Sequence, residues 1–267
     1  MTDAGPGARP AIESIVATGR GDDGTTGLLY GGERIRKDDL RTEAYGTIDE
    51  AVAALGLARA HLAGAVQAEA AHLLDRAFSA GARIGLQPEL ARADAASTES
   101  LLAHAAFAEA TERRAPVTTA AELSGLILRF QRELFVAAAE LATNPDAWGR
   151  LVDGKTRVSA EMVSGVEAIL VNFEARIVMP REFVVAGETL ASAGLELGRT
   201  ILRRAERRAV TLEAAGLVPG DHLVRYLNRL ADLLWVLARA AEQAEFRTAT
   251  PSRAERSTRT ARSKAKK

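Results

Sequence analysis

Residues 220–244 read GDHLVRYLNRLADLLWVLARAAEQA and carry the clearest helical pattern in the chain. Apolar side chains recur there at steps of three and four, the spacing of one buried helix face: Leu223, Leu227, Leu230, Leu234, Leu237 and Ala241. The same spacing places Asn228, Asp232 and Arg239 together on a different face. The segment therefore predicts a core helix with a line of polar side chains beside its apolar stripe.

Helical patterns extend outward from this segment through most of the chain. They begin near Leu40, return in the apolar stretch around 126–135, and continue over about 158–177 and 187–214. We therefore expect an all-α fold, a helical bundle with a polar seam.

Composition limits the kind of protein this is. The 267 residues are 47% hydrophobic, which is enough for a proper core, and 35 basic residues balance 35 acidic ones, so no overall charge favours nucleic acid or a membrane. The chain has no cysteine, which excludes disulfides and thiolate chemistry. It shows neither a signal-like amino terminus nor a membrane-spanning run, and we expect a cytoplasmic protein without membrane contact.

Three segments differ from the helical domain that we expect over residues 14–245. Residues 1–13 suggest a flexible amino terminus, and residues 246–267, basic and without apolar periodicity, suggest a disordered tail. Residues 62–120 are alanine-rich and indicate a helical insertion. His61, His72 and His104 lie in or beside it without metal-ligand spacing, so we assign no metal site.

The run RTILRRAERR at 199–208 concentrates five arginines and one glutamate in one helical segment. Arg199, Arg203, Glu206 and Arg207 fall on one side, and Leu197, Ile201 and Ala205 fall on the opposite side. Converging guanidinium groups suit the oxygens of a polyphosphate. A solvent-exposed helix laced with ion pairs explains the same pattern, and the run alone leaves both readings open.

A glycine-rich segment, GRGDDG at 19–24, formally matches a dinucleotide-binding fingerprint. That fingerprint needs a helix directly behind its last glycine, whereas TTGLLYGG follows here, and the segment itself contains no Gly-Lys-Ser/Thr sequence of a Walker loop. What remains is a polar loop whose backbone N–H groups could wrap a triphosphate, or an ordinary turn.

Three segments taken in order carry a resemblance: TGRGDDGTTGLLYGGERIRKDD at 18–39, EAYGTIDEAVAALGLAR at 43–59, and the arginine run followed by YLNRLADLLWVLAR at 226–239. This set resembles the ATP:cob(I)alamin adenosyltransferases of the propanediol-utilisation type, over roughly residues 14–60 and 125–243. The resemblance implies a five-helix bundle that assembles as a homotrimer, with active sites between adjacent subunits. It favours the polyphosphate reading of the arginine run.

The resemblance also implies the residues of a nucleotide site, with ATP between the glycine-rich loop and the arginine helix. The loop contacts would be Thr18, Gly19, Arg20, Gly21, Thr25 and Thr26, and Lys37 would contact phosphate. The second set of nucleotide contacts would be Arg203, Arg204, Glu206, Arg207 and Asn228.

Three further residues are assigned to catalysis by the resemblance. Arg199 matches an arginine that pairs with an aspartate across the subunit boundary, and Asp49 is the candidate partner. Phe183 matches an aromatic residue that closes the lower face of the corrin ring, although its apolar neighbours in FVV would by themselves suggest a core residue.

The implied reaction transfers the 5′-deoxyadenosyl group of ATP to Co(I) of a reduced corrinoid, with Mg²⁺ as cofactor and triphosphate as product. The implied partners are ATP, the corrinoid, a flavoprotein reductase and an adenosylcobalamin-dependent acceptor enzyme. The chain departs from the family at Ala186, Gly187 and Glu188 after the aromatic residue, and at Glu196, where a histidine is usual. Glu196 lies within helical reach of Arg199 and Arg203. A non-catalytic ATP- and corrinoid-binding protein and a purely structural bundle remain the alternatives.

Overall fold

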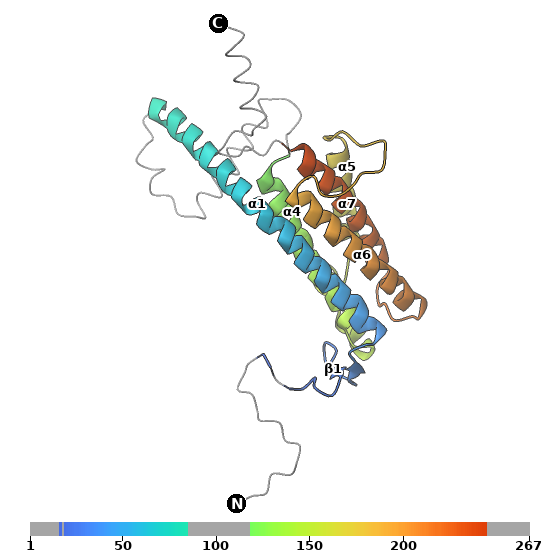
Figure 1. The fold of residues 1–267 in the computed structure, drawn as a ribbon. Coiled ribbons are helices and arrows are strands. Elements are labelled where there is room, and N and C mark those ends of the chain that lie inside the picture. The colour runs from blue at the N-terminus through green and yellow to red at the C-terminus, as the bar shows by residue number, and fades with distance from the viewer. Residues whose placement is uncertain (1–15, 18, 85–117, 245–267) are drawn as a thin grey trace, which may run out of the picture.

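The computed structural model describes residues 16–17, 19–84 and 118–244 (Figure 1). Five α-helices dominate these residues: α1 (Leu40–Ile84), α4 (Ala120–Ala142), α5 (Ala160–Glu174), α6 (Leu190–Ala214) and α7 (Leu223–Gln243). A 3₁₀-helix, η1 (Pro145–Arg150), follows α4, and two short antiparallel strands, β1 (Thr25–Thr26) and β2 (Ile35–Arg36), precede α1. The expected helical bundle is confirmed.

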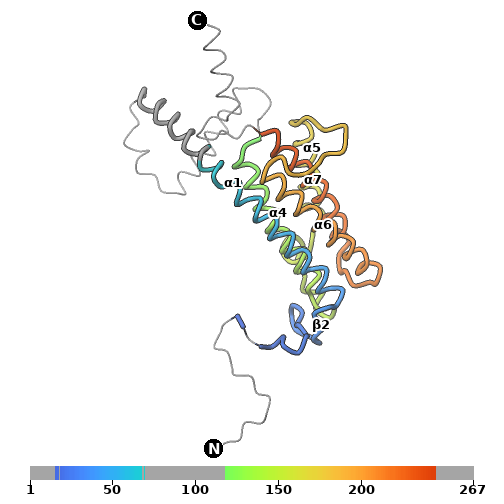
Figure 2. Tube along the Cα trace, viewed as in Figure 1, coloured from blue at the N-terminus to red at the C-terminus, as the bar shows by residue number. Residues whose placement is uncertain are grey.

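Several predicted features lie outside the described residues. These are Thr18, the amino-terminal residues 1–13, residues 85–117 of the expected insertion, and the tail 246–267. Within the described residues α1 passes position 62, the expected start of the insertion, and continues to Ile84 as one helix. Figure 2 traces the chain through α4, α5, α6 and α7.

Capping residues set the first turns of three helices: α5 and α6 begin slightly later than their patterns suggested, whereas α4 begins before the apolar stretch at 126–135. Thr119, Ser159 and Thr189 are the N-caps of α4, α5 and α6, and each side chain accepts a hydrogen bond from a backbone N–H of the first turn. Glu69 of α1 adds a second restraint, because its carboxylate accepts the N–H of Ala120 at 2.8 Å. A negative charge at a helix N-terminus is favourable, so α1 and α4 are joined at this point.

The bundle is organised around α1, α6 and α7. α1 packs against both α4 and α6, and α7 packs against α6 and α5. The apolar stripe predicted for α7 is fully buried, with Leu223, Leu227, Leu230, Leu234 and Leu237 each 0% exposed. Burial of such side chains from water is the main favourable contribution to folding.

The buried face of α6 differs from the prediction at one position. Leu197 was expected on the apolar side but is 48% exposed, whereas Ala205 is buried as expected. The reason is that α6 lies between α1 and α7 and turns small residues toward α1. A Cβ atom at Gly194 would lie 2.9 Å from the Cα of Ala58, so the two helices approach too closely for a larger side chain.

The carboxyl end of α4 contains a buried acid. Glu140 is 1% exposed, and its Oε2 accepts the backbone N–H of Val158 at 2.8 Å. Burial raises the pKa of Glu140 to about 7, against the opposing effects of the Val158 hydrogen bond and the Arg157 charge, while Asp153 adds to the increase. Near neutral pH this carboxyl group is therefore close to half protonated.

We expect Glu140→Gln to make the free energy of unfolding less dependent on pH. Because the folded pKa lies above the ordinary value, the stabilisation from the protonated carboxyl is fully present below about pH 4.5 and is lost as the pH rises through 7. The amide cannot ionise, so the variant should gain on the order of 3 kcal/mol over the wild type between pH 5 and 8.5. Denaturant unfolding at both pH values measures this, and a constant difference between the two proteins would contradict it.

Candidate functional site

A line of polar contacts joins α6 and α7. The side-chain amide of Asn228 donates to Glu206 Oε1 at 3.0 Å, and Arg239 Nη2 lies 3.3 Å from Glu196 Oε1. These contacts confirm the polar seam expected from the sequence of α7. They also bring together Glu206 and Asn228, two residues that the resemblance assigned to one nucleotide.

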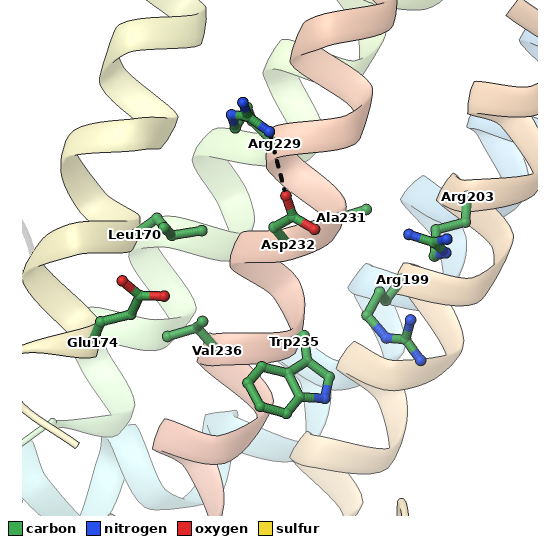
Figure 3. Close-up of a pocket in the computed structure, with 9 residues that line it drawn as sticks. All are labelled: Leu170, Glu174, Arg199, Arg203, Arg229, Ala231, Asp232, Trp235 and Val236. Carbon is green, nitrogen blue, oxygen red and sulfur yellow. Dashed lines mark ion pairs between the residues drawn. The ribbon is translucent and has the colours of Figure 1, made fainter. Parts of the chain in front are cut away.

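Beside this seam lies a pocket of about 400 Å³ formed by α5, α6 and α7 (Figure 3). In Figure 3, Arg199 and Arg203 extend from α6 on one side, α7 runs through the centre, and Glu174 and Leu170 extend from α5 on the other side. The lining residues combine charged groups, apolar groups and one tryptophan: Leu170, Glu174, Arg199, Arg203, Arg229, Ala231, Asp232, Trp235 and Val236. We call this the α5–α7 pocket.

The five arginines of the run have different surroundings. Arg208 pairs with Glu43 at 2.6 Å and also contacts Thr47, and Arg204 pairs with Glu50, so these two join α6 to α1. Arg203 and Arg207 are exposed, and Arg207 Nη1 donates to the backbone carbonyl of Arg203 at 3.1 Å. Part of the run is thus an ion-paired helix face, which was one interpretation of the sequence. The rest supplies exposed guanidinium groups, as the polyphosphate interpretation requires.

Arg199 is only partly exposed and pairs with a glutamate on its own helix. Its Nε donates to Glu196 Oε2 at 2.6 Å, which is the pair expected from their helical spacing. Asp49, the proposed partner of Arg199, lies on the exposed side of α1. An exposed position leaves Asp49 accessible to another subunit.

The glycine-rich loop is a small, internally bonded hairpin. Arg34, which sequence reasoning missed, joins its two sides: Nε donates to Thr25 Oγ1 at 2.7 Å, and Nη2 donates to the carbonyl oxygens of Arg20 and Thr25 at 2.8 and 2.9 Å. Thr25 also donates from its hydroxyl and its backbone N–H to Asp23 Oδ1, and these hydrogen bonds lower the pKa of Asp23. A lone arginine ten residues beyond a glycine motif gives no sequence signal for this role.

Lys37 lies against the glycine-rich turn, as a phosphate-contacting residue would. A Cβ atom built on Gly21 would stand 2.8 Å from Lys37 Nζ, and the backbone N–H of Lys37 donates to the carbonyl of Gly24 at 2.9 Å. Gly21 therefore leaves the space that the lysine side chain occupies. The ammonium group of Lys37 thus lies beside Gly21, one of the predicted phosphate contacts.

The loop is attached to the end of α4. The N–H of Leu29 donates to the carbonyl of Ala142 at 2.8 Å, and Asn144 Nδ2 donates to the carbonyl of Gly31 at 2.9 Å. Gly32 has φ +93° and leaves no room for a Cβ beside Asn144, so glycine is required there. Figure 1 shows the hairpin beyond the first turn of α1, at one end of the bundle.

Phe183 lies on the segment that connects α5 to α6 and is fully exposed, and Val185 on the same segment is also largely exposed. The interpretation of Phe183 as a core residue is therefore wrong. The sequence FVV suggested burial, but the segment leaves the bundle after α5 and packs little of its apolar surface. This exposure leaves the Phe183 ring accessible to a ligand or to another subunit.

Residues from α5 and α7 complete the α5–α7 pocket, and sequence reasoning did not select them. Trp235 sits in the string LLWVL, which is indistinguishable from core, and Arg229 adjoins Asn228 and donates to its Oδ1 at 2.9 Å. Glu174 is the last residue of its helix and carries no motif. Only the packing of three helices brings these side chains to one place.

Comparison with known proteins gives concordant matches. The sequence model of the cobalamin adenosyltransferase family matches residues 16–113 and 90–241. A corrinoid adenosyltransferase from Citrobacter freundii is 31% identical over 227 residues, which are 85% of this chain and 94% of that protein. The corrinoid adenosyltransferase PduO of Salmonella typhimurium is 32% identical over 85% of this chain, and this chain spans 49% of its length.

Solved structures share the fold. A variant PduO-type ATP:corrinoid adenosyltransferase from Lactobacillus reuteri, complexed with ATP, superposes with a TM-score of 0.57 at 21% identity, over 85% of this chain and 94% of that one. A second variant of the Lactobacillus reuteri enzyme, complexed with cobalamin and ATP, gives a TM-score of 0.55 over 85% and 90% of the two chains.

The fold and the pocket define a helical-bundle protein with two arginines on one wall of a pocket between its helices. The family match extends over most of the chain, and the relative from Citrobacter freundii is covered almost completely. The chain therefore belongs to the cobalamin adenosyltransferase family. Among its described residues no helix is long and apolar enough to cross a membrane.

Proposed function

We propose that the protein is a corrinoid adenosyltransferase that transfers the 5′-deoxyadenosyl group of ATP to the cobalt of a Co(I) corrinoid. The Co(I) electron pair forms the bond to C5′ while the C5′–O bond breaks, and triphosphate leaves with the electrons of that bond. Cobalt becomes Co(III) in the product, adenosylcobalamin. The observation that carries the proposal is the placement of Arg199 and Arg203 on one wall of the α5–α7 pocket in a chain of this family.

The role of the arginines follows from the charge that develops in this reaction. Negative charge grows on the triphosphate as the C5′–O bond breaks, and guanidinium groups already in place stabilise it. Arg203 and Arg207 are exposed and one turn apart on α6, so both can reach one polyphosphate. Arg204 would join them by exchanging its contact with Glu50 for phosphate, a change that its partly exposed position permits.

Glu206 and Asn228 suit the nucleoside end of ATP. Their mutual hydrogen bond joins both side chains across the α6–α7 seam, and on α6 Glu206 directly precedes Arg207 and lies one turn beyond Arg203. A carboxylate and an amide held in this way can accept from and donate to sugar hydroxyls and the base. We assign both residues to ATP, as the resemblance implied.

The glycine-rich loop would supply the remaining phosphate contacts from a neighbouring subunit. In one chain Arg34 joins the two sides of the hairpin and the end of α4 holds it at the end of the bundle, while the α5–α7 pocket lies along the helices. A homotrimer, with each site closed by the loop of the next subunit, would bring Gly21, Thr25, Thr26 and Lys37 to the arginines. The same boundary would pair Arg199 with Asp49 of the partner subunit.

Mg²⁺ fits this site as an ion that enters with ATP. Among the described residues, no group of three or more His, Cys, Asp or Glu side chains is placed to hold a metal ion. Mg²⁺ in nucleotide sites is commonly held by phosphate oxygens and water, with few protein ligands. When bound, it would share the neutralisation of the leaving triphosphate with the arginines.

Anaerobic incubation with ATP, Mg²⁺ and chemically reduced cobalamin tests the proposal. We expect formation of the light-sensitive cobalt–carbon product, followed by its absorbance and its loss on illumination. Binding of ATP without any product would indicate a carrier or sensor on the same fold, and calorimetry without ATP or corrinoid affinity would leave only a structural bundle. A flavoprotein reductase would supply Co(I), and an adenosylcobalamin-dependent enzyme would accept the product.

A further inference from the structure

Four charged side chains form an alternating line across the α6–α7 seam. Glu242 Oε1 lies 2.8 Å from Arg239 Nη2, the same nitrogen lies 3.3 Å from Glu196 Oε1, and Glu196 Oε2 accepts Arg199 Nε at 2.6 Å. The line starts inside the bundle and ends at Arg199, on the wall of the α5–α7 pocket. Of the two carboxylates in this line, Glu196 is the one that contacts both arginines.

From Arg239 onward the line becomes more exposed toward the pocket. The exposed fraction of the side chain is 3% for Arg239, 8% for Glu196 and 25% for Arg199. Arg239 is also restrained by the Trp235 ring, whose centroid is 5.6 Å from its Cζ. Arg239 makes both of its ion pairs through Nη2, and breaking either would leave a buried charge without that partner, so these contacts hold Glu196 beside the partly exposed Arg199 guanidinium.

The geometry of the contact determines what Arg199 can still do. Glu196 uses the Nε edge of the guanidinium, so the terminal nitrogens Nη1 and Nη2 remain the groups directed to a second carboxylate or to a phosphate. An exposed arginine without such a contact samples many rotamers, and ordering it on binding costs free energy. Pairing with Glu196 removes much of this cost before the ligand arrives.

We propose that Glu196, braced by Arg239, is a positioning residue that fixes the Arg199 guanidinium at the wall of the α5–α7 pocket. This inference rests on the proposed function, because it concerns the reaction in which Arg199 takes part. Glu196 acts through Arg199 and touches neither ATP nor corrinoid. It also gives a role to a residue at which the chain departs from the family pattern.

Glu196→Gln should lower the anaerobic transfer rate about tenfold at saturating ATP. The amide keeps the shape of the side chain but loses the charge that holds Arg199. Glu242→Gln is the matched control: it removes a carboxylate from the other side of Arg239 without contacting Arg199. We expect a similar fall in melting temperature for both variants, but a transfer rate within about twofold of wild type for Glu242→Gln.

A double-mutant cycle separates positioning from general stability. If Glu196 acts through Arg199, then Glu196→Gln should have no further effect on the transfer rate in an Arg199→Ala background. Equal effects in both backgrounds would overturn the inference while leaving the proposed function intact. Product formation by the wild-type protein is measured first, and its absence would count against the proposed function alone.

Crystal structures of the two variants test the position of the Arg199 guanidinium without an activity assay. In Glu196→Gln the Arg199 guanidinium should leave its position at the pocket wall, whereas in Glu242→Gln it should remain there. An Arg199 that keeps its place without the Glu196 charge would overturn the inference, whatever the transfer assay shows.

Discussion

Arg203→Ala should lower the anaerobic transfer rate about a hundredfold. Arg203 is exposed on α6 and lines the α5–α7 pocket, so truncation removes a charged contact to the leaving triphosphate. Loss of one preorganised contact of this kind raises the barrier by ~3 kcal/mol, which is about a factor of one hundred in rate. Single-turnover formation of adenosylcobalamin from prereduced cobalamin and saturating ATP measures the step directly.

Arg208→Ala is the matched control, since it makes the same substitution one and a half turns further along α6. Arg208 contacts Glu43 and Thr47 on α1, and a partly exposed ion pair of this type contributes at most about 1 kcal/mol to stability. We expect a slightly lower melting temperature and a transfer rate within about twofold of wild type. Equal losses of rate in the two variants would show that the arginines act through the fold and would remove the assigned role of Arg203.

The two arginines differ in which neighbouring helix they face, and the sequence of α6 alone does not determine this. Periodicity predicted the helices and the buried leucines of α7 correctly, because a single helix determines which of its residues share a face. It could not determine which surface of α6 meets α1, and so it placed Leu197 on the wrong side. That choice depends on the close approach at Gly194, which only the packed structure contains.

The candidate site shows the same limit. Glu206 and Asn228 were selected through the resemblance, and the structure joins them with a hydrogen bond. Trp235 and Glu174 were not selected, because each contributes to the α5–α7 pocket only after α5 has packed on α7. Residues that belong to family motifs can be selected from sequence even when they lie on different helices, whereas residues without a motif that meet only through packing require the tertiary structure.

Phe183→Ala should separate reduction of the corrinoid from transfer of the adenosyl group. An apolar ring at the lower axial face of cobalt leaves Co(II) four-coordinate and easier to reduce, which is the role implied for Phe183 by the resemblance. In assays that begin with Co(II) corrinoid and a reductant, we expect product formation to fall at least about tenfold, equivalent to ~1.4 kcal/mol. In assays that begin with prereduced Co(I), the loss should be much smaller, because the step that needs the ring has been bypassed.

Stability offers no competing explanation for this variant. Phe183 is fully exposed, so its truncation removes no core packing, and the melting temperature should stay at the wild-type value. Val185→Ala is the matched control, because Val185 is exposed on the same segment and is 88% accessible to solvent. Equal losses from Co(II) and Co(I) in Phe183→Ala would mean that the ring binds the corrinoid without affecting cobalt coordination. Equal effects of Phe183→Ala and Val185→Ala would instead assign the segment between α5 and α6 to general apolar contact, and the aromatic ring would have no specific role.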